Sequence, residues 1–160
     1  MREVKLRDGF SMLIAIMALV TVAFLSSIVL SISSKMIKET TNQYQHEQAQ
    51  LYAKSFTEYA IMALTANERN STCLEDINGT IGDPDSGNGY KILVNVSFIG
   101  NGIGQGDISK CSLTRQLSNS VTTVNSPLSA IIDVYVRYKD PDRSSNNSWF
   151  TYHRRTLQKI

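Results

Sequence analysis

Hydrophobic and polar residues are unevenly distributed along this chain of 160 residues. A run of 25 residues, 10–34, contains no charged side chain, and its polar members are all serine or threonine. As an α-helix this run would span roughly 37 Å, which exceeds the ~30 Å hydrocarbon core of a bilayer. The pattern therefore predicts a membrane-spanning helix near the N-terminus.

The next segment, residues 35–64, contains no proline and no glycine. Its apolar residues recur at spacings of three, four or seven, which is typical of one face of a helix. We therefore expect one helix from Phe10 to Leu64, with an amphipathic second half. The expected apolar face consists of Ile37, Tyr44, Leu51, Tyr52, Phe56, Tyr59, Met62 and Ala63.

Beyond this segment the apolar period becomes that of a β-strand. Strand patterns occur over residues 91–98, 130–138 and 149–157, with a weaker one over 121–124. Turn-rich stretches separate them, over residues 82–89, 100–106 and 140–147. Strands joined in this way predict a small antiparallel sheet that is half buried, and the helix face near Leu51 and Leu64 is the candidate cover. The predicted fold class is α+β, a long N-terminal helix packed against a small sheet.

Basic residues precede the uncharged run, and few lie beside its far end. By the positive-inside rule the N-terminus lies in the cytoplasm and most of the chain outside. We expect a cytoplasmic leader over residues 1–9, a transmembrane helix over 10–34, its amphipathic continuation over 35–64 and a periplasmic sheet domain over 65–160. A cleaved secretory signal is the rival interpretation, but its apolar region would be only about 7–15 residues long.

The leader and the uncharged run meet at residues 5–10, which read Lys-Leu-Arg-Asp-Gly-Phe. A short charged leader, a glycine directly before a phenylalanine and then an uncharged helix resemble the type IV prepilin and pseudopilin family. The resemblance implies that a membrane-embedded prepilin peptidase cuts between Gly9 and Phe10 and methylates the new amino group of Phe10. Glycine suits the close approach of a protease because it has no Cβ. The alternative is an uncleaved single-pass anchor with an accidental Gly-Phe pair.

Ile14 stands where most members of that family carry a glutamate. In the family, this acid is thought to pair with the N-terminal amine of a neighbouring subunit, since an unpaired charge in an apolar bundle is costly. The resemblance therefore implies a minor subunit, placed at or near the filament tip. A variant major pilin is the alternative.

The expected function is that of a minor pilin or pseudopilin in a type IV pilus, a type II secretion system or a competence-type DNA-uptake filament. The resemblance implies three kinds of partner: prepilin peptidase, other pilins or pseudopilins, and an inner-membrane assembly platform. The chain would lie first in the bacterial inner membrane and later in a filament at the cell surface. The rival function is an uncleaved, membrane-anchored periplasmic module that binds a ligand or DNA.

The two cysteines, Cys73 and Cys111, both fall on the predicted outer side. An oxidising compartment favours a disulfide between them, which would close a loop of 39 residues. Such a bond would contribute about 4 kcal/mol in the chain-entropy model. Their spacing fits neither a zinc site nor a CxxC redox pair, and two free thiols are the alternative.

Asn70 and Asn78 each begin an Asn-x-Ser/Thr triplet, and each has an acidic residue two positions earlier. The triplet is the acceptor for N-linked glycans. The added acid resembles the extended acceptor of bacterial N-linked glycosylation. Both asparagines are therefore candidate glycosylation sites, and a polar loop is the alternative.

Two other polar loops invite a binding interpretation. Asp83 and Asp85 lie in an oxygen-rich turn of the kind that binds calcium, but the EF-hand spacing is not met. The glycines of residues 100–106 alternate at every second position, which does not match a dinucleotide fingerprint or a P-loop. We expect a solvated turn and a surface loop, with Asp83 and Asp85 as a weak calcium candidate and no other metal site.

Charge is concentrated at the C-terminal end. The chain has a net charge of +2, whereas residues 137–160 hold six basic and two acidic residues. Aromatic residues interleave with the basic ones there, as in proteins that bind single-stranded nucleic acid. In a strand Arg154 and Arg155 would point to opposite faces, so we expect a charged rim around buried aromatic residues. Contact of Arg154 and Arg155 with nucleic acid is the alternative. Nothing resembles a catalytic constellation, and we expect neither an enzyme nor a cofactor.

Overall fold

The computed structural model describes residues 7–67, 72–100, 111–118, 128–139 and 148–160. Its elements, in chain order, are α1 (Arg7–Ala66), β1 (Asp76–Asp83), β2 (Asn88–Gly100), the 3-10 turn η1 (Leu113–Arg115), β3 (Gln116–Ser118), β4 (Leu128–Lys139) and β5 (Trp149–Lys159). The chain divides into two compact units, Met1–Gln43 and Tyr44–Ile160. The predicted α+β fold class is confirmed.

The first unit contains the apolar part of α1. This helix is long and apolar enough to cross a membrane, and none of its most apolar stretch is buried by the rest of the chain. Between Met12 and Ile32 the large apolar side chains are 41–71% exposed. Hydroxyl groups in this stretch bond to the helix itself: Thr21 donates to the carbonyl of Ala18, and Ser26 donates to that of Val22. These two hydroxyl groups are therefore satisfied without water, which is compatible with an apolar environment.

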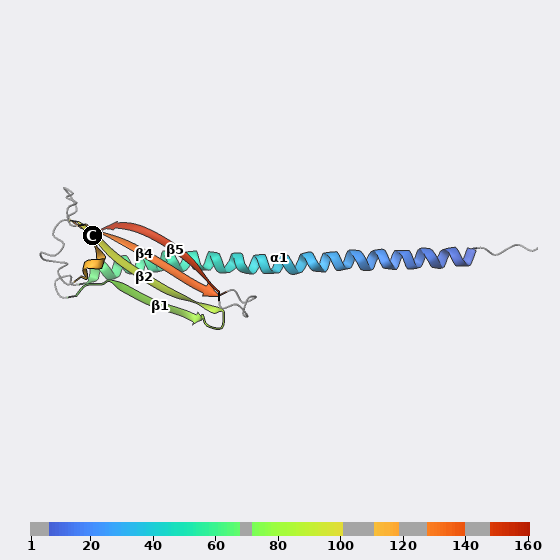
Figure 1. Cartoon of the computed structure of the whole chain (residues 1–160), viewed down its shortest axis with the longest axis horizontal. Coiled ribbons are helices and arrows are strands. Elements are labelled where there is room, and N and C mark those ends of the chain that lie inside the picture. The colour runs from blue at the N-terminus through green and yellow to red at the C-terminus, as the bar shows by residue number, and fades with distance from the viewer. Residues whose placement is uncertain (1–6, 68–71, 101–110, 119–127, 140–147) are drawn as a thin grey trace, which may run out of the picture. The chain divides into compact units, whose positions relative to one another are not determined.

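The second unit is built on an open sheet in the order β1-β2-β4-β5, whose strands run side by side in Figure 1. All three pairings along this path are antiparallel, as predicted. The short strand β3 departs from the prediction, because it pairs parallel with the end of β2 at Phe98 and Ile99. Strand β1 was not predicted, since its sequence has only two large apolar residues. The predicted strand over 121–124 lies outside the described residues.

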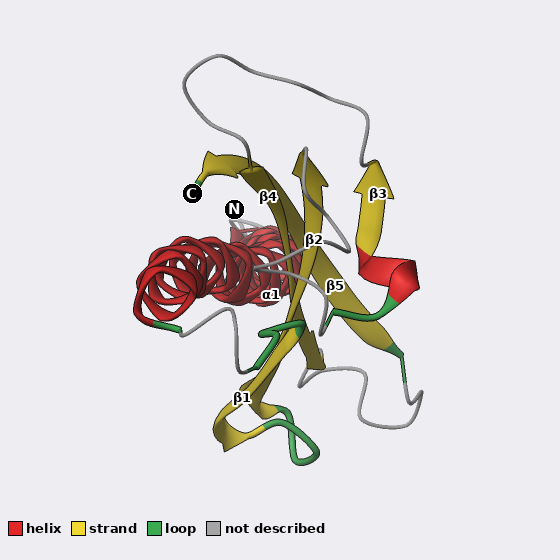
Figure 2. Ribbon diagram, turned by 90° about the vertical axis from the view of Figure 1, so that its left-hand side faces the viewer, coloured by secondary structure: helices red, strands yellow, loops and turns green. Residues whose placement is uncertain are grey.

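The alternating residues of β2 and β4 form the core of the second unit. Val94, Val96, Ile132, Val134 and Val136 are fully buried, and in the register Val94 stands opposite Val134 and Val96 opposite Ile132. This face of the sheet packs against α1 (Figure 2). The prediction that the alternating apolar residues share one buried face is therefore confirmed.

The helix packs on the sheet through small side chains rather than large ones. The residues of α1 that are buried are Ala49, Ala53, Thr57, Ala60 and Leu64, which lie on one face at helical spacing. Tyr52 and Phe56 flank this face and are partly buried. Small side chains let the helix backbone approach the β-branched surface of the sheet closely, which explains the choice of face.

The expected apolar face is therefore wrong at five of its positions. Those residues are exposed by 53–68%: Ile37, Tyr44, Leu51, Tyr59 and Met62. In the second unit, these large side chains point away from the sheet. This part of α1 therefore carries two stripes. The stripe expected to pack contains Leu51 and Tyr59 and is exposed, whereas the stripe that packs on the sheet contains Ala53 and Ala60.

Four aromatic rings from different elements form a chain of contacts at one end of the sheet. Tyr52 of α1 lies 4.9 Å from Tyr90 of β2, Tyr90 lies 5.7 Å from Tyr138 of β4, and Tyr138 stacks 5.7 Å from Phe150 of β5. Burial, with the neighbouring tyrosines, raises the pKa of Tyr90 to about 12. The Tyr90 hydroxyl lies 3.4 Å from the carbonyl of Gln45. These contacts fix the helix against the strand ends.

Candidate functional site

The predicted cleavage point lies near the start of α1. Because the helix begins at Arg7, the Gly9–Phe10 bond is in helical backbone. Ile14 is 53% exposed within the first unit. Both positions are therefore in the helix α1, and their roles remain predictions.

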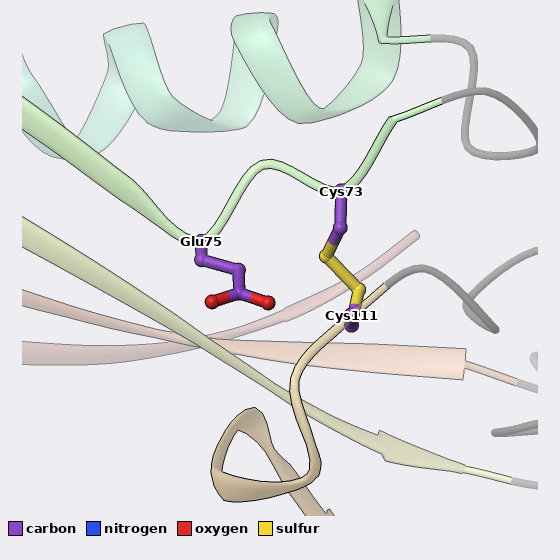
Figure 3. Close-up of side chains that lie close together, drawn as sticks. All are labelled: Cys73, Glu75 and Cys111. Atoms are coloured by element: carbon purple, nitrogen blue, oxygen red, sulfur yellow. A yellow bond between two sulfur atoms is a disulfide. The ribbon is translucent and has the colours of Figure 1, made fainter.

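The predicted disulfide is confirmed. Cys73 and Cys111 are bonded, with their Cα atoms 5.1 Å apart, as Figure 3 shows. The bond joins the segment that leads into β1 to the segment that leads into η1. It therefore fastens the start of the sheet to the segment that carries η1 and β3.

Glu75 lies beside the disulfide (Figure 3) and holds the same two segments together. Its carboxylate accepts hydrogen bonds from the backbone N–H and the hydroxyl of Ser112. Within the described residues, Cys73, Glu75 and Cys111 are the one group of three Cys, His, Asp or Glu side chains close enough to share a metal ion. Both sulfurs are used by the disulfide, so this cluster is structural in the form shown.

The two aspartates proposed for calcium have protein partners in the turn between β1 and β2. Asp83 accepts hydrogen bonds from the backbone N–H groups of Asp85 and Ser86, which is the pattern of an Asx turn. The carboxylate of Asp85 pairs with Lys91 at 3.1 Å. The geometry is that of a solvated turn, and the calcium site remains a weak prediction.

Arg154 and Arg155 are not brought together. Arg155 is on the exposed face of β5 and donates to both carboxylate oxygens of Asp133, at 2.7 and 3.0 Å. Arg154 shares the face of Tyr152, which packs on the core beside α1, and its Nε is buried without a hydrogen-bond partner. The alternation expected from the sequence thus separates the two guanidinium groups, and they do not form one basic patch.

Asp133 is a buried carboxylate on the sheet face opposite α1. Besides Arg155, it bonds to His153, whose Nε2 lies 2.6 Å away, and the His153 ring stacks on Tyr135 at 4.4 Å. Burial alone would raise the pKa of Asp133. The hydrogen bonds and charges of Arg155 and His153 outweigh burial and lower this pKa below its usual 3.8. The same contact raises the pKa of Arg155.

Trp149 gathers three cations that sequence analysis did not connect. The side-chain nitrogens of Lys91 and Lys139 each lie 4.9 Å from the ring centroid, and the guanidinium carbon of Arg137 lies 5.4 Å from it. Asp85 faces this group, at 3.1 Å from Lys91 and 4.0 Å from Lys139. We call Lys91, Arg137, Lys139 and Trp149 the Trp149 cluster.

Part of the Trp149 cluster could have been found in the sequence. Arg137 and Lys139 are two residues apart, so alternation places them on one face of a strand. The register decides the rest, since Lys139 stands opposite Trp149, and Lys91 stands opposite Arg137. That pairing involves strands far apart in the chain, which no local pattern fixes.

Of the two candidate glycosylation sites, Asn78 lies in β1 and is exposed, and Asn70 lies outside the described residues. The glycine-rich stretch after β2 is also outside them from residue 101 onward.

No family model, curated protein or solved structure matches this chain. The fold itself shows a long, apolar N-terminal helix whose C-terminal part packs on an antiparallel sheet. This is the arrangement that the prepilin resemblance implies. The first part of the helix could span a membrane.

Proposed function

We propose that this chain is a minor pilin or pseudopilin, a structural subunit of a type IV pilus, a type II secretion system or a DNA-uptake filament. The observation that carries the proposal is the Gly9–Phe10 junction at the start of an uncharged run, in a helix that continues onto a small sheet. The Gly-Phe pair, the uncharged run and the helix-on-sheet fold are each common alone, and their order along one chain favours this family.

The exposed apolar side chains of the first unit support this proposal. Between Met12 and Ile32 they are 41–71% exposed. Apolar surface on this scale is not stable in water. Lipid would cover it while the subunit waits in the inner membrane, and the helices of neighbouring subunits would cover it after an assembly platform extracts the subunit into a filament. The sheet unit would then face outward.

Processing by a prepilin peptidase would act on the Gly9–Phe10 junction. The enzyme would cleave the peptide bond after Gly9, and the amine of Phe10 would then be methylated. Because Gly9 and Phe10 lie in helical backbone, the first turns of α1 must unwind to give the extended form that a protease binds. The free-energy cost of that unwinding is small next to Gly9, since glycine is a poor helix former.

The first experiment measures the intact mass and the N-terminal sequence of the membrane form, with an active and an inactive prepilin peptidase. We expect a chain that begins at Phe10 and carries one added methyl group, and only with the active enzyme. The variant Gly9→Val should stay uncleaved, because a branched Cβ blocks close approach. A chain that still begins at Met1 beside the active peptidase would discard the filament proposal.

Ile14 supports placement at or near the filament tip. Without an acid at this position, the subunit offers no partner to the amine of a following subunit. We expect immunogold labelling to find the wild type at filament ends, and Ile14→Glu to bring the subunit into the shaft. Uniform labelling of the shaft by the wild type would contradict tip placement.

The alternative function is an uncleaved anchored module that binds an anionic ligand such as DNA, and the Trp149 cluster favours it. Three cations share one indole, and among the described residues the carboxylate that faces them is that of Asp85. The ring can hold the cations in place while a phosphate pairs with them.

Trp149 is the single tryptophan of the chain, so its fluorescence reports on this cluster directly. Titration of the full chain in detergent with single-stranded DNA should change the emission, with an affinity that falls as salt rises. Arg137→Gln should weaken binding, whereas Lys54→Gln, an exposed change on α1, should not. Absent or salt-insensitive binding would end this alternative.

A further inference from the structure

The segment Asp76-Ile77-Asn78-Gly79-Thr80 lies entirely within β1. Because side chains alternate along a strand, its residues divide into two sets. Ile77 and Gly79 point toward α1 and are partly buried, whereas Asp76, Asn78 and Thr80 are exposed on the opposite face. The acid, the amide and the hydroxyl of the motif therefore project side by side from one surface.

Asn78 has no structural role in the described part of the chain. Its side-chain amide makes no hydrogen bond there, whereas that of Asn67 donates to the carbonyl of Thr72 and also accepts from its hydroxyl. Asparagine is also depleted in strands, because it competes for backbone hydrogen bonds. An unengaged, exposed asparagine in a strand is thus a residue that folding does not require.

The position of β1 leaves room for a large substituent on Asn78. The strand is at the edge of the sheet and pairs with β2 alone, where Asn78 stands opposite Leu93. Leu93 is 37% exposed, so the surface beside Asn78 is open. The other face of β1 packs closely against α1, since a Cβ on Gly79 would lie 2.6 Å from the Phe56 ring. A group on Asn78 would extend into solvent without disturbing the core.

Another Asn-x-Ser triplet, in β2, gives an internal comparison. Asn95-Val96-Ser97 also has the Asn-x-Ser pattern, but Leu93 rather than an acid stands two residues earlier. Asn95 is half-buried on β2, between two neighbouring strands. It lacks both the acid and the accessible edge that Asn78 has.

We propose that Asn78 is the acceptor of an N-linked glycan. The donor would be an oligosaccharide carried on a polyprenyl pyrophosphate. The amide nitrogen of Asn78 would form a bond to the anomeric carbon of the sugar and lose one proton, while the bond between that carbon and the pyrophosphate breaks and the pyrophosphate leaves with its electron pair. The glycan would cover Leu93 and the sheet surface around it. This inference rests on the proposed placement of the sheet unit outside the cytoplasm.

The test expresses the full chain in bacteria with an oligosaccharyltransferase and its lipid-linked glycan, and measures intact mass. The wild type should carry a glycan increment, and Asn78→Gln should lose one glycan. Thr80→Val keeps a β-branched residue in the strand but removes the hydroxyl, and should lose the same glycan. Asn95→Gln should leave the mass increment unchanged.

A glycan on the neighbouring candidate, Asn70, must be distinguished from one on Asn78 by mutation. No lysine or arginine lies between Arg69 and Lys91, so trypsin leaves Asn70 and Asn78 in one peptide. Asn70→Gln should therefore keep the glycan on Asn78. An increment that Asn78→Gln does not reduce would overturn the proposal, as would a wild type without any increment.

N-terminal sequencing of the same samples distinguishes this inference from the proposed function. When an active prepilin peptidase is expressed as well, a glycosylated chain that begins at Met1 would support the acceptor site and contradict the pilin proposal. A chain that begins at Phe10 and carries no glycan would do the reverse. Thermal unfolding of Asn78→Gln should match the wild type, since an exposed, unbonded side chain is changed.

Discussion

Gly79 of β1 lies directly against the ring of Phe56 on α1. A Cβ at position 79 would be 2.6 Å from Cε1 of Phe56 and 2.7 Å from its Cζ. Real side chains do not approach so closely, so this glycine is required by packing rather than by a turn. The contact sets how near the edge of the sheet lies to the helix.

Gly79→Ala should destabilise the sheet unit by about 1–3 kcal/mol, because the added methyl group overpacks the interface. Chemical unfolding of the full chain in detergent, followed by the fluorescence of Trp149, measures the change. Phe56→Leu added to Gly79→Ala should restore part of the loss, since the shorter side chain leaves room for the methyl group. Equal destabilisation in the single and double variants would contradict the contact.

The buried stripe of α1, which contains Ala53, should be sensitive to substitution, and the exposed stripe, which contains Leu51, should not. Ala53 is fully buried against the sheet, so Ala53→Leu should destabilise the unit by about 1–3 kcal/mol. Leu51 is 56% exposed, so Leu51→Gln should change the free energy of unfolding by less than about 0.5 kcal/mol. The same unfolding measurement serves both variants, and a large loss in Leu51→Gln would show that the helix packs through the other stripe.

The pair between Asp133 and Arg155 predicts a loss of stability in acid. The pKa of Asp133 is lower in the folded state than its usual 3.8, so the unfolded chain binds a proton first as pH falls. The contribution is complete well above pH 3.8 and is lost as pH falls through the folded pKa. At neutral pH, Asp133→Asn should cost roughly 1–2 kcal/mol, since Arg155 and His153 are both partly in water.

Unfolding curves at several pH values between about 2 and 6 test this prediction. Asp133→Asn should remove part of the decline in stability at low pH. Arg155→Gln should also reduce the decline, because it removes hydrogen bonds that lower the pKa of Asp133. A decline that is as steep in both variants as in the wild type would assign the acid sensitivity to other groups.

The Cys73–Cys111 disulfide should contribute about 4 kcal/mol to the free energy of unfolding, by restricting the unfolded chain. The double variant Cys73→Ser, Cys111→Ser should lower the denaturant midpoint accordingly. Thiol labelling of the denatured wild type should find no free thiol before reduction and two after it. If reductant shifts the midpoint of the serine variant as much as that of the wild type, the effect does not come from this bond.

Much of the fold was determined by local patterns in the sequence. The uncharged run of residues 10–34 is long and apolar enough to cross a membrane, and a helix is the form that satisfies its backbone without water. Alternation in β2 and β4 sets which side chains are buried, because a strand has only two faces. The disulfide followed from two cysteines alone, once the outer side was inferred from charge.

Tertiary structure decided the features that depend on size and on register. Sequence periodicity selected Leu51 rather than Ala53 as part of the packed side of α1, and this was wrong because the choice depends on how closely helix and sheet approach. Strand β1 has little apolar pattern and exists because β2 offers it an edge.

The candidate site residues also divide into those that a local motif indicates and those that only the tertiary structure brings together. The Gly9–Phe10 junction is a local motif and was visible in the sequence. The Trp149 cluster and the carboxylate of Asp133 between Arg155 and His153 join strands whose register is fixed by the whole sheet. Short-range preferences determine which elements form, whereas the contacts between elements are set by packing, which involves residues far apart in the chain.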